Sequence, residues 1–370
     1  MSHTLRSSVL AAAIAAAALT VGCQKAVDTT DANAAAPVQA APVAPEAAPR
    51  VALTPPPAAI VEGKPVPVVP HPDPLSVLQS ANPALAANKR LLFDMWRTAL
   101  NAGHLEVLDA MVAEDYIQYS PFQRSGRDAM KETFSVIPRS ETIPEIMRPP
   151  PVTLIAENDL VVFAAVDTYQ EPDGSGPYTT THFNMFRVVD GRLAAHWHPD
   201  RNPPCPDLPS AAEGGPQPVT GVTGVAQFAL LDAATPELAA NKRLVFDMWR
   251  HLNDAGREET ADLYLAPDYI EHSPNAATGR DGAKAYFATQ QDLPIETTLR
   301  APLVAMLAED DIVVQVLKVE LPDPFREGQI YTTVWMDMFR IREGRIAEHW
   351  DAAVKPGTLV EELGAACETD

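Results

Sequence analysis

The sequence repeats itself at a spacing of 153 residues, and this duplication constrains the fold more than any other feature. The run at 88–97 recurs at 241–250 with nine of ten positions identical. Further runs match at the same spacing: 115–117 with 268–270, 126–128 with 279–281, 185–187 with 338–340, and His196-Trp197 with His349-Trp350. Matches spread over so long a stretch predict two copies of a whole domain of about 120 residues, not a short solenoid unit.

Each copy has the pattern of helices followed by strands, which is clearest in the second. Thr235 and Pro236 are typical of an N-cap and first helical position, and apolar residues then recur at helical spacing. A short helix is expected near 257–265, and Thr278 is expected to cap a third. Strands are predicted at 303–308, 312–319, 331–341 and 345–352. This order predicts an α+β fold with a mainly antiparallel sheet.

Two runs of the second copy, 268–274 (DYIEHSP) and 337–351 (DMFRIREGRIAEHWD), resemble motifs of SnoaL-like proteins. These are the polyketide cyclase-related branch of the NTF2-like superfamily. The resemblance covers both repeats, about two-thirds of the chain. It implies two cones, each a curved antiparallel sheet wrapped by about three helices around an apolar pocket. It also allows the two copies to pair within one chain as a pseudo-dimer, with a homodimer of the chain as the alternative.

The resemblance also implies a type of chemistry. Enzymes of this family use a carboxylate and a histidine as acid–base groups on enolisable carbonyl compounds, as isomerases, cyclases or lyases of the aldol type. They need no metal and no organic cofactor, so none is expected here. Many members have no known reaction, so whether this chain is an enzyme stays open.

The last hairpin of the second copy indicates where such groups lie. A two-residue turn at 343–344 would pair Arg342 with Arg345, and strict alternation then assigns each residue to a face. One face, expected to be covered by helices, would carry Trp335, Asp337, Phe339, Ile341, Ile346, Glu348 and Trp350. The opposite face, with Met336, Met338, His349 and Asp351, is expected to contact another sheet.

The candidate catalytic residues are Asp337, Glu348 and His272. Burial would raise a carboxyl pKa towards neutrality, which suits a general base or acid, and His272 would orient or protonate a carbonyl oxygen. The candidate binding residues are Tyr269, Trp335, Phe339, Trp350, His349 and Asp351. Structural alternatives stay open. Asp337 could bind Tyr269 or a helix terminus, Glu348 could be solvated, His272 could be a loop histidine with its hydrogen bonds satisfied, and the tryptophans could be core.

The first copy departs from the second at these positions. It has Asn184 in place of Asp337, Ala195 in place of Glu348, and Tyr119 in place of His272, with His182 and His198 at the positions of Trp335 and Asp351. An amide and an alanine cannot exchange protons as carboxyl groups do. The second copy is therefore the better candidate for chemistry, and the first a structural partner or a site for another ligand.

The N-terminus predicts export. Arg6 precedes an apolar run at 9–21, too short to span a bilayer comfortably, and Leu19–Cys23 resembles a bacterial lipobox. This implies a signal peptide at 1–22 and lipidation of Cys23, with Gln24 favouring an outer-membrane anchor that faces the periplasm. An ordinary secretory signal is the alternative. The remaining segments are an Ala/Pro-rich tether (23–82), domain 1 (83–201), a linker (202–234), domain 2 (235–356) and a tail (357–370).

The net charge limits the classes of binding partner, and the cysteines allow one disulfide. The net charge of −21 argues against nucleic acid and against electrostatic binding to anionic lipid. Cys205 and Cys367 each follow one repeat, and they could form a disulfide or stay as two free thiols. Three functions are consistent with the sequence: an acid–base enzyme, a carrier of a small apolar molecule, and a scaffold built from paired domains.

Overall fold

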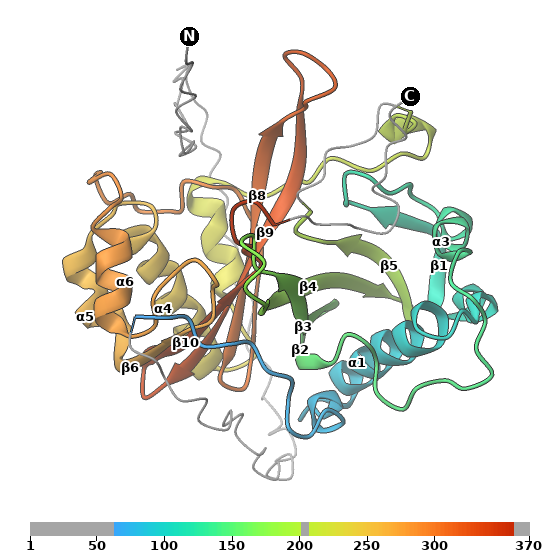
Figure 1. Cartoon of the computed structure of the whole chain (residues 1–370), viewed down its shortest axis with the longest axis horizontal. Helices are drawn as coiled ribbons and strands as arrows, with labels where there is room; N and C mark the ends of the chain where they lie inside the picture. Colours follow the sequence, from blue (N-terminus) through green and yellow to red (C-terminus); the bar gives the residue numbers. More distant parts are fainter. Residues whose placement is uncertain (1–62, 201–206, 359–370) are drawn as a thin grey trace, which may run out of the picture. The chain divides into compact units, whose positions relative to one another are not determined.

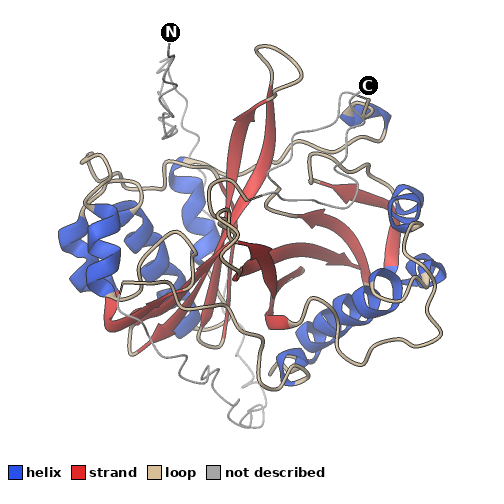
Figure 2. Cartoon of the chain, in the orientation of Figure 1, coloured by secondary structure: helices blue, strands red, loops and turns tan. Residues whose placement is uncertain are grey.

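The computed structural model describes residues 63–200 and 207–358, and both repeats have the same architecture. In domain 1 the main elements are α1 (Pro83–Met95), α2 (Leu108–Met111), β1 (Val112–Gln118), α3 (Arg127–Phe134), β2 (Pro151–Glu157), β3 (Leu160–Gln170), β4 (Pro177–Val189) and β5 (Arg192–Trp197). In domain 2 they are α4 (Pro236–Leu252), α5 (Ala261–Tyr264), β6 (Leu265–Glu271), α6 (Arg280–Phe287), β7 (Leu303–Glu309), β8 (Ile312–Pro322), β9 (Ile330–Arg342) and β10 (Arg345–Asp351). The predicted α+β layout is confirmed (Figures 1 and 2).

Each domain contains one five-stranded sheet. The strand orders are β1-β5-β4-β3-β2 and β6-β10-β9-β8-β7. The first pair in each order is parallel and the other pairs are antiparallel. Figure 1 shows α4, α5 and α6 over one face of the second sheet. The concave space between helices and sheet is where the family resemblance places a pocket.

The predicted N-cap of α4 is confirmed, whereas the predicted N-cap of α6 is wrong. Thr235 caps α4 by accepting a hydrogen bond from Leu238 N, and Pro236 occupies the first turn. Thr278 does not cap α6, because its hydroxyl accepts from Glu271 N and the helix begins one residue later than expected. The N-cap is Gly279 with φ of 91°, a backbone conformation that favours glycine.

The register of the β9–β10 hairpin differs from the predicted one. The turn is as expected, with positive φ at Glu343 and Gly344, and Ile346 faces Ile341. The pairing then shifts, so that Glu348 faces Arg340 and His349 faces Phe339. Ala347 is thus the extra residue of a β-bulge, which reverses the face of every later side chain. Domain 1 has the equivalent shift between Arg187 and Val188 opposite β5.

The sheets pack on each other through the faces turned away from the helices. One apolar cluster contains Phe183, Met185 and Trp197 of domain 1 together with Met336, Met338 and Trp350 of domain 2. In each domain one further apolar cluster fills the space between helices and sheet.

Two lysines join the domains in reciprocal fashion. Lys89 of α1 lies 2.5 Å from a carboxylate oxygen of Glu309 in β7, and Lys242 of α4 lies 2.7 Å from Glu157 in β2. Glu309 also accepts from Ala156 N and Glu157 from Ala308 N. Each domain therefore supplies one buried lysine and one acceptor to the other, which is the pattern of a two-fold contact within one chain.

The segments flanking domain 1 are partly packed. Near the end of the predicted tether, Val66 N donates to Glu271 O, and His71 N donates to Pro151 O. Within the predicted linker, a 3₁₀ helix at Gly224–Leu231 packs on the core of domain 2. The predicted signal peptide with Cys23, and both Cys205 and Cys367, lie outside the described residues.

Candidate functional site

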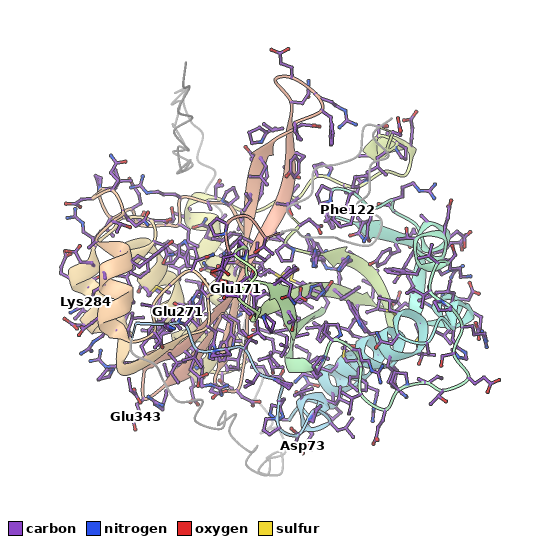
Figure 3. The ribbon with its side chains drawn as sticks, viewed as in Figure 1. Asp73, Phe122, Glu171, Glu271, Lys284 and Glu343 are labelled. Atoms are coloured by element: carbon purple, nitrogen blue, oxygen red, sulfur yellow. The ribbon has the colours of Figure 1, made fainter. Side chains whose placement is uncertain are left out.

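Domain 2 encloses a cavity of about 390 Å³ between its helices and sheet. Aromatic and aliphatic side chains from α4, α6 and β9 form most of the wall, and acidic side chains with one histidine form a polar patch. Its lining includes Trp249, Leu265, Tyr269, Glu271, Tyr286, Phe287, Trp335, Asp337, Phe339, His349 and Asp351. In Figure 3, Glu271 lies among packed side chains, whereas the exposed Glu343 lies at the outer tip of the β9–β10 turn.

His349 bridges two carboxylates at the polar patch. Its Nδ1 lies 2.9 Å from Glu271 Oε1, and its Nε2 lies 3.1 Å from Asp337 Oδ1. Glu271 is held in turn by Ser273 N, at 2.9 Å from Oε1, and by the hydroxyl of Tyr269, at 2.7 Å from Oε2. Because carboxylates only accept, both ring nitrogens of His349 carry hydrogens and the ring is an imidazolium.

The pKa shifts agree with this arrangement. Burial works against the charged ring, yet the carboxylates of Glu271 and Asp337 outweigh it and hold the pKa of His349 well above its usual value. Burial alone would raise the pKa of Glu271, but the neighbouring His349 brings it below the ordinary value. His349 and Glu271 therefore form a buried ion pair that orients the ring.

One oxygen of Asp337 lacks a hydrogen-bond partner among the described residues. Its Oδ1 accepts from Trp335 Nε1 at 3.1 Å and from His349, while the buried Oδ2 has no hydrogen-bond partner among the described residues. Burial raises the pKa of Asp337, although the hydrogen bond from His349 opposes the shift. A desolvated carboxylate that has one oxygen without a hydrogen-bond partner is suited to act as a general base.

Asp351 lies directly opposite Asp337 across the β9–β10 pair. Burial, with smaller contributions from the Glu271 and Asp337 carboxylates and an opposing one from His349, raises the pKa of Asp351 to about 6. Ligand atoms of Asp337, His349 and Asp351 all lie within 4.8 Å of one another, a spacing that a metal ion could use. Such an ion would have to displace the hydrogen bond between His349 Nε2 and Asp337.

The bulge decides which predicted residues reach the cavity. Asp337, Tyr269, Trp335 and Phe339 line it as expected. His349 and Asp351 line it too, although alternation had assigned them to the sheet-contact face. Glu348 and Trp350, predicted to face the pocket, lie on the opposite face, and His272 lies with them.

These three residues have structural partners instead. Glu348 Oε1 lies 3.0 Å from Arg340 Nε, an ion pair buried at the sheet contact. The ring of His272 stacks on Trp350 with centroids 4.6 Å apart, and its Nδ1 lies 2.9 Å from the carbonyl oxygen of Val66. His272 therefore secures the end of the tether on domain 2.

Among the acidic side chains and the histidine that line the cavity, Glu271 is the one that the sequence prediction missed. A signal was available, because Tyr269 and Glu271 are two residues apart in a strand and so share a face. With Tyr269 predicted in the pocket, Glu271 belonged there as well.

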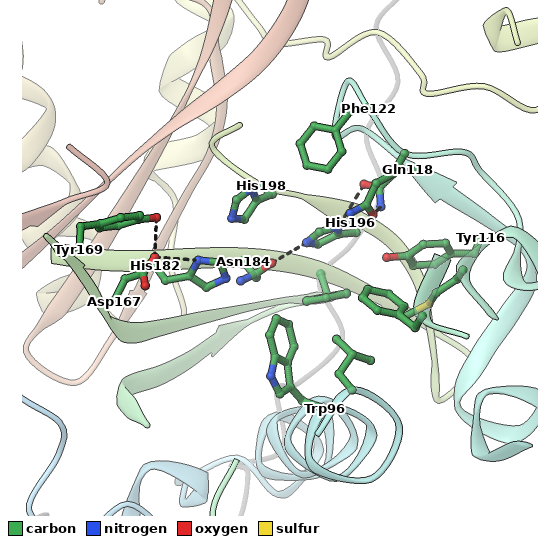
Figure 4. Close-up of a pocket in the computed structure, with 15 residues that line it drawn as sticks. Trp96, Tyr116, Gln118, Phe122, Asp167, Tyr169, His182, Asn184, His196 and His198 are labelled. Atoms are coloured by element: carbon green, nitrogen blue, oxygen red, sulfur yellow. Dashed lines mark hydrogen bonds and ion pairs between the residues drawn. The ribbon is translucent and has the colours of Figure 1, made fainter. Parts of the chain in front are cut away.

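Domain 1 repeats the arrangement with amides. His196 Nδ1 lies 3.0 Å from Gln118 Oε1 and its Nε2 lies 2.8 Å from the Asn184 side chain, at the positions of Glu271 and Asp337 (Figure 4). Here no carboxylate offsets burial, which lowers the pKa of His196 well below its usual value, helped by the nearby His198 and His182. The same scaffold thus holds a charged histidine in one domain and a neutral one in the other.

The comparisons with known proteins agree with the fold. The model of the SnoaL-like domain matches residues 93–196 and 245–349, together more than half of the chain, so the protein belongs to the SnoaL-like family. No curated protein matches its sequence.

Solved structures resemble one repeat at a time. TsrD from Streptomyces laurentii is 23% identical over 30% of this chain and 87% of its own, with a TM-score of 0.23. An LEH-like epoxide hydrolase from M. tuberculosis is 17% identical over 32% of this chain and 80% of its own, with a TM-score of 0.25. An NTF2-like protein of unknown function from Burkholderia pseudomallei is 16% identical over 30% and 87%, with a TM-score of 0.22.

Helices long and apolar enough to cross a bilayer do not occur among residues 63–200 and 207–358.

Proposed function

We propose that domain 2 is a cofactor-independent acid–base enzyme that enolises a small, mainly apolar carbonyl compound. The observation that carries the proposal is the unpartnered, buried Oδ2 of Asp337, a residue that lines an apolar cavity and whose other oxygen is fixed by Trp335 and His349. Proton abstraction next to a carbonyl needs just such a desolvated base beside a hydrogen-bond donor for the oxygen.

The two aspartates divide the work. Asp337 Oδ2 takes the proton from the carbon next to the carbonyl, and the electrons of that C–H bond move to form the enolate. Asp351, protonated below its pKa of about 6, donates its proton or a hydrogen bond to the enolate oxygen. His349 exchanges no proton with the substrate, because both its nitrogens are bound within the protein, and it acts as a positioning residue for Asp337. The enol can then return to an isomeric ketone or attack a second carbonyl.

Proton exchange tests the proposal without knowledge of the natural substrate. The wild-type protein should accelerate deuterium uptake by some member of a panel of apolar cyclic ketones, followed by NMR in D₂O. Asp337→Asn should lower that rate about 10²- to 10⁴-fold, the usual worth of a positioned general base. The control is Asp268→Asn, which removes an exposed carboxyl of the same domain and should change nothing. Equal rates for wild type and Asp337→Asn would overturn the assignment.

A second candidate is a carrier that binds an apolar molecule without converting it. Both ring nitrogens of His349 bind carboxylates of the protein, so the ring cannot pass protons to a ligand. This observation favours the carrier. A ligand that copurifies with the protein and is released unchanged, with no ketone exchanging faster than in buffer, would support the carrier over the enzyme.

We also propose that the chain is exported and held at the outer membrane by lipid on Cys23, as the lipobox-like run at 19–23 suggests. The packed segment at 64–71 would then mark where the tether joins the folded part.

A further inference from the structure

The cavity of domain 1 has the build of a ligand site in its own right. It encloses about 240 Å³ between the helical turn Trp96–Leu100 that continues α1, helix α3 and the first sheet, and its apolar wall includes Trp96, Phe122, Met130 and Phe186. Figure 4 shows Asn184 and His196 on its floor, with His182 and His198 beside them. Asn184 is 2% exposed, and one atom of its amide, Nδ2, has no hydrogen-bond partner in the described part of the chain.

The hydrogen bonds around His196 decide which amide atom a ligand meets. Ser120 N donates to Gln118 Oε1 at 2.9 Å, so this oxygen is an acceptor. His196 Nδ1 lies 3.0 Å from the same oxygen and must carry a hydrogen. In a neutral ring Nε2 is then the acceptor, and its partner on Asn184 must be a donor.

The oxygen and nitrogen of a carboxamide exchange places by a half-turn of the group. Nε2 lies 2.8 Å from the position of Asn184 Oδ1, and after the half-turn the NH₂ group occupies that position and donates to the ring. The carbonyl oxygen of Asn184 then takes the buried place that has no hydrogen-bond partner, on a residue that lines the cavity. The floor of domain 1 thus offers an acceptor without a charge, where the floor of domain 2 offers the carboxylate of Asp337.

The titratable groups around this floor bind one another or other side chains of domain 1. Burial, with a smaller effect of His198, lowers the pKa of His182 to about 3, so that ring is neutral as well. The carboxylate of Asp167 is at the side of the cavity, where it accepts from the Tyr169 hydroxyl at 2.8 Å. Asp200 Oδ1 lies 2.5 Å from His198 Nδ1.

We propose that domain 1 is a second ligand site that takes an uncharged, mainly apolar molecule and binds its hydroxyl group, of an alcohol, phenol or enol, at the amide of Asn184. The site holds its ligand without proton transfer, because an amide is not a general base. It goes beyond the acid–base role of domain 2 and does not depend on it. A chain that converts a ketone in one domain can in this way also retain a neutral hydroxylated compound in the other.

Three matched probes test the proposal on the full chain: 2-naphthol, its methyl ether 2-methoxynaphthalene, and the anion 2-naphthoate. Naphthol should bind and shift the imidazole NMR signals of His196, which reports on the domain 1 floor directly. The methyl ether lacks the donor and should bind about 5- to 10-fold more weakly, the worth of one hydrogen bond of about 1 kcal/mol. The naphthoate should bind more weakly still, since it presents a charge and no donor.

Variants separate the two cavities. Asn184→Leu should abolish the preference for naphthol over its ether, whereas Asp337→Leu, the same change at the matching position of domain 2, should keep that preference at His196. Three results would overturn the proposal: equal affinity of wild type for naphthol and ether, no change of the His196 signals at saturating naphthol, or tightest binding of naphthoate. The probe comparison on wild type decides even if a variant fails to fold.

Discussion

His349 and His196 hold matching positions in the two sheets, yet one lies between two carboxylates and the other between two carboxamides. The exchange of Glu271 for Gln118 and of Asp337 for Asn184 preserves shape and removes negative charge. The two rings should therefore differ in protonation at the same pH, which makes each the control for the other.

Nitrogen NMR of the imidazole rings at pH 7 checks this first prediction. His349 should show two protonated nitrogens and His196 one. The double change Glu271→Gln with Asp337→Asn rebuilds the domain 1 set around His349 and should turn its spectrum into that of a neutral ring. The reciprocal change Gln118→Glu with Asn184→Asp should charge His196. If His349 stays doubly protonated between two amides, the carboxylates are not what holds its proton.

A second prediction concerns the pH response of Asp351. A carboxyl whose pKa is raised to about 6 stays protonated in the folded protein where the unfolded chain is already ionised. Its contribution to the free energy of unfolding is therefore greatest below the ordinary aspartate pKa and is lost as pH rises through about 6. Burial raises the pKa of Asp254 to about 6 as well, so carbon NMR of the side-chain carboxyls should show two transitions near pH 6. One of them should disappear in Asp351→Asn and the other in Asp254→Asn. Two transitions that both survive Asp351→Asn would contradict the assignment.

The activity should follow the same group. If Asp351 supplies the proton to the enolate oxygen, ketone exchange by wild type should fall as pH rises through about 6. In Asp351→Asn the rate should be lower and should no longer fall over that range. A fall that is unchanged in the variant would exclude Asp351 as the acid.

A third prediction concerns the stability of the domain contact. Lys242 is almost fully buried and pairs with Glu157 of the other domain. Lys242→Met leaves that carboxylate buried without its cation and should lower the free energy of unfolding by about 3–5 kcal/mol, measured by urea denaturation. Arg243→Met is the matched control, because its ion pair with Asp247 is half exposed and should contribute about 0–1 kcal/mol. Similar losses for both variants would mean that the buried pair has no special role.

A fourth prediction concerns Cys23. If it carries lipid, wild-type protein made in a Gram-negative cell should partition with membranes and incorporate labelled fatty acid. Cys23→Ala should do neither, while the folded domains remain intact by thermal unfolding. A soluble wild-type protein cut near residue 22 without lipid would point to an ordinary secretory signal.

The sequence allowed the fold to be predicted further than the site. The duplication, the cap at Thr235 and the turn at 343–344 follow from local chemistry, and all are confirmed. The bulge at Ala347 has no such local signature, because alanine fits a regular strand as well as a bulge. Alternation carried across it put Glu348 and Trp350 in the wrong place. Asp337 lies on the other strand of the hairpin and was placed correctly.

The shift in register has a historical reading as well. Both hairpins carry it, at Ala347 and opposite Arg187, so the single domain already had it before it was copied. The substitutions that separate Asn184 from Asp337 came after that event, on two floors that each hold a histidine between two side chains. Gene duplication here supplied a second copy of a backbone frame that was already set, and the side chains on its floor then diverged in charge and size.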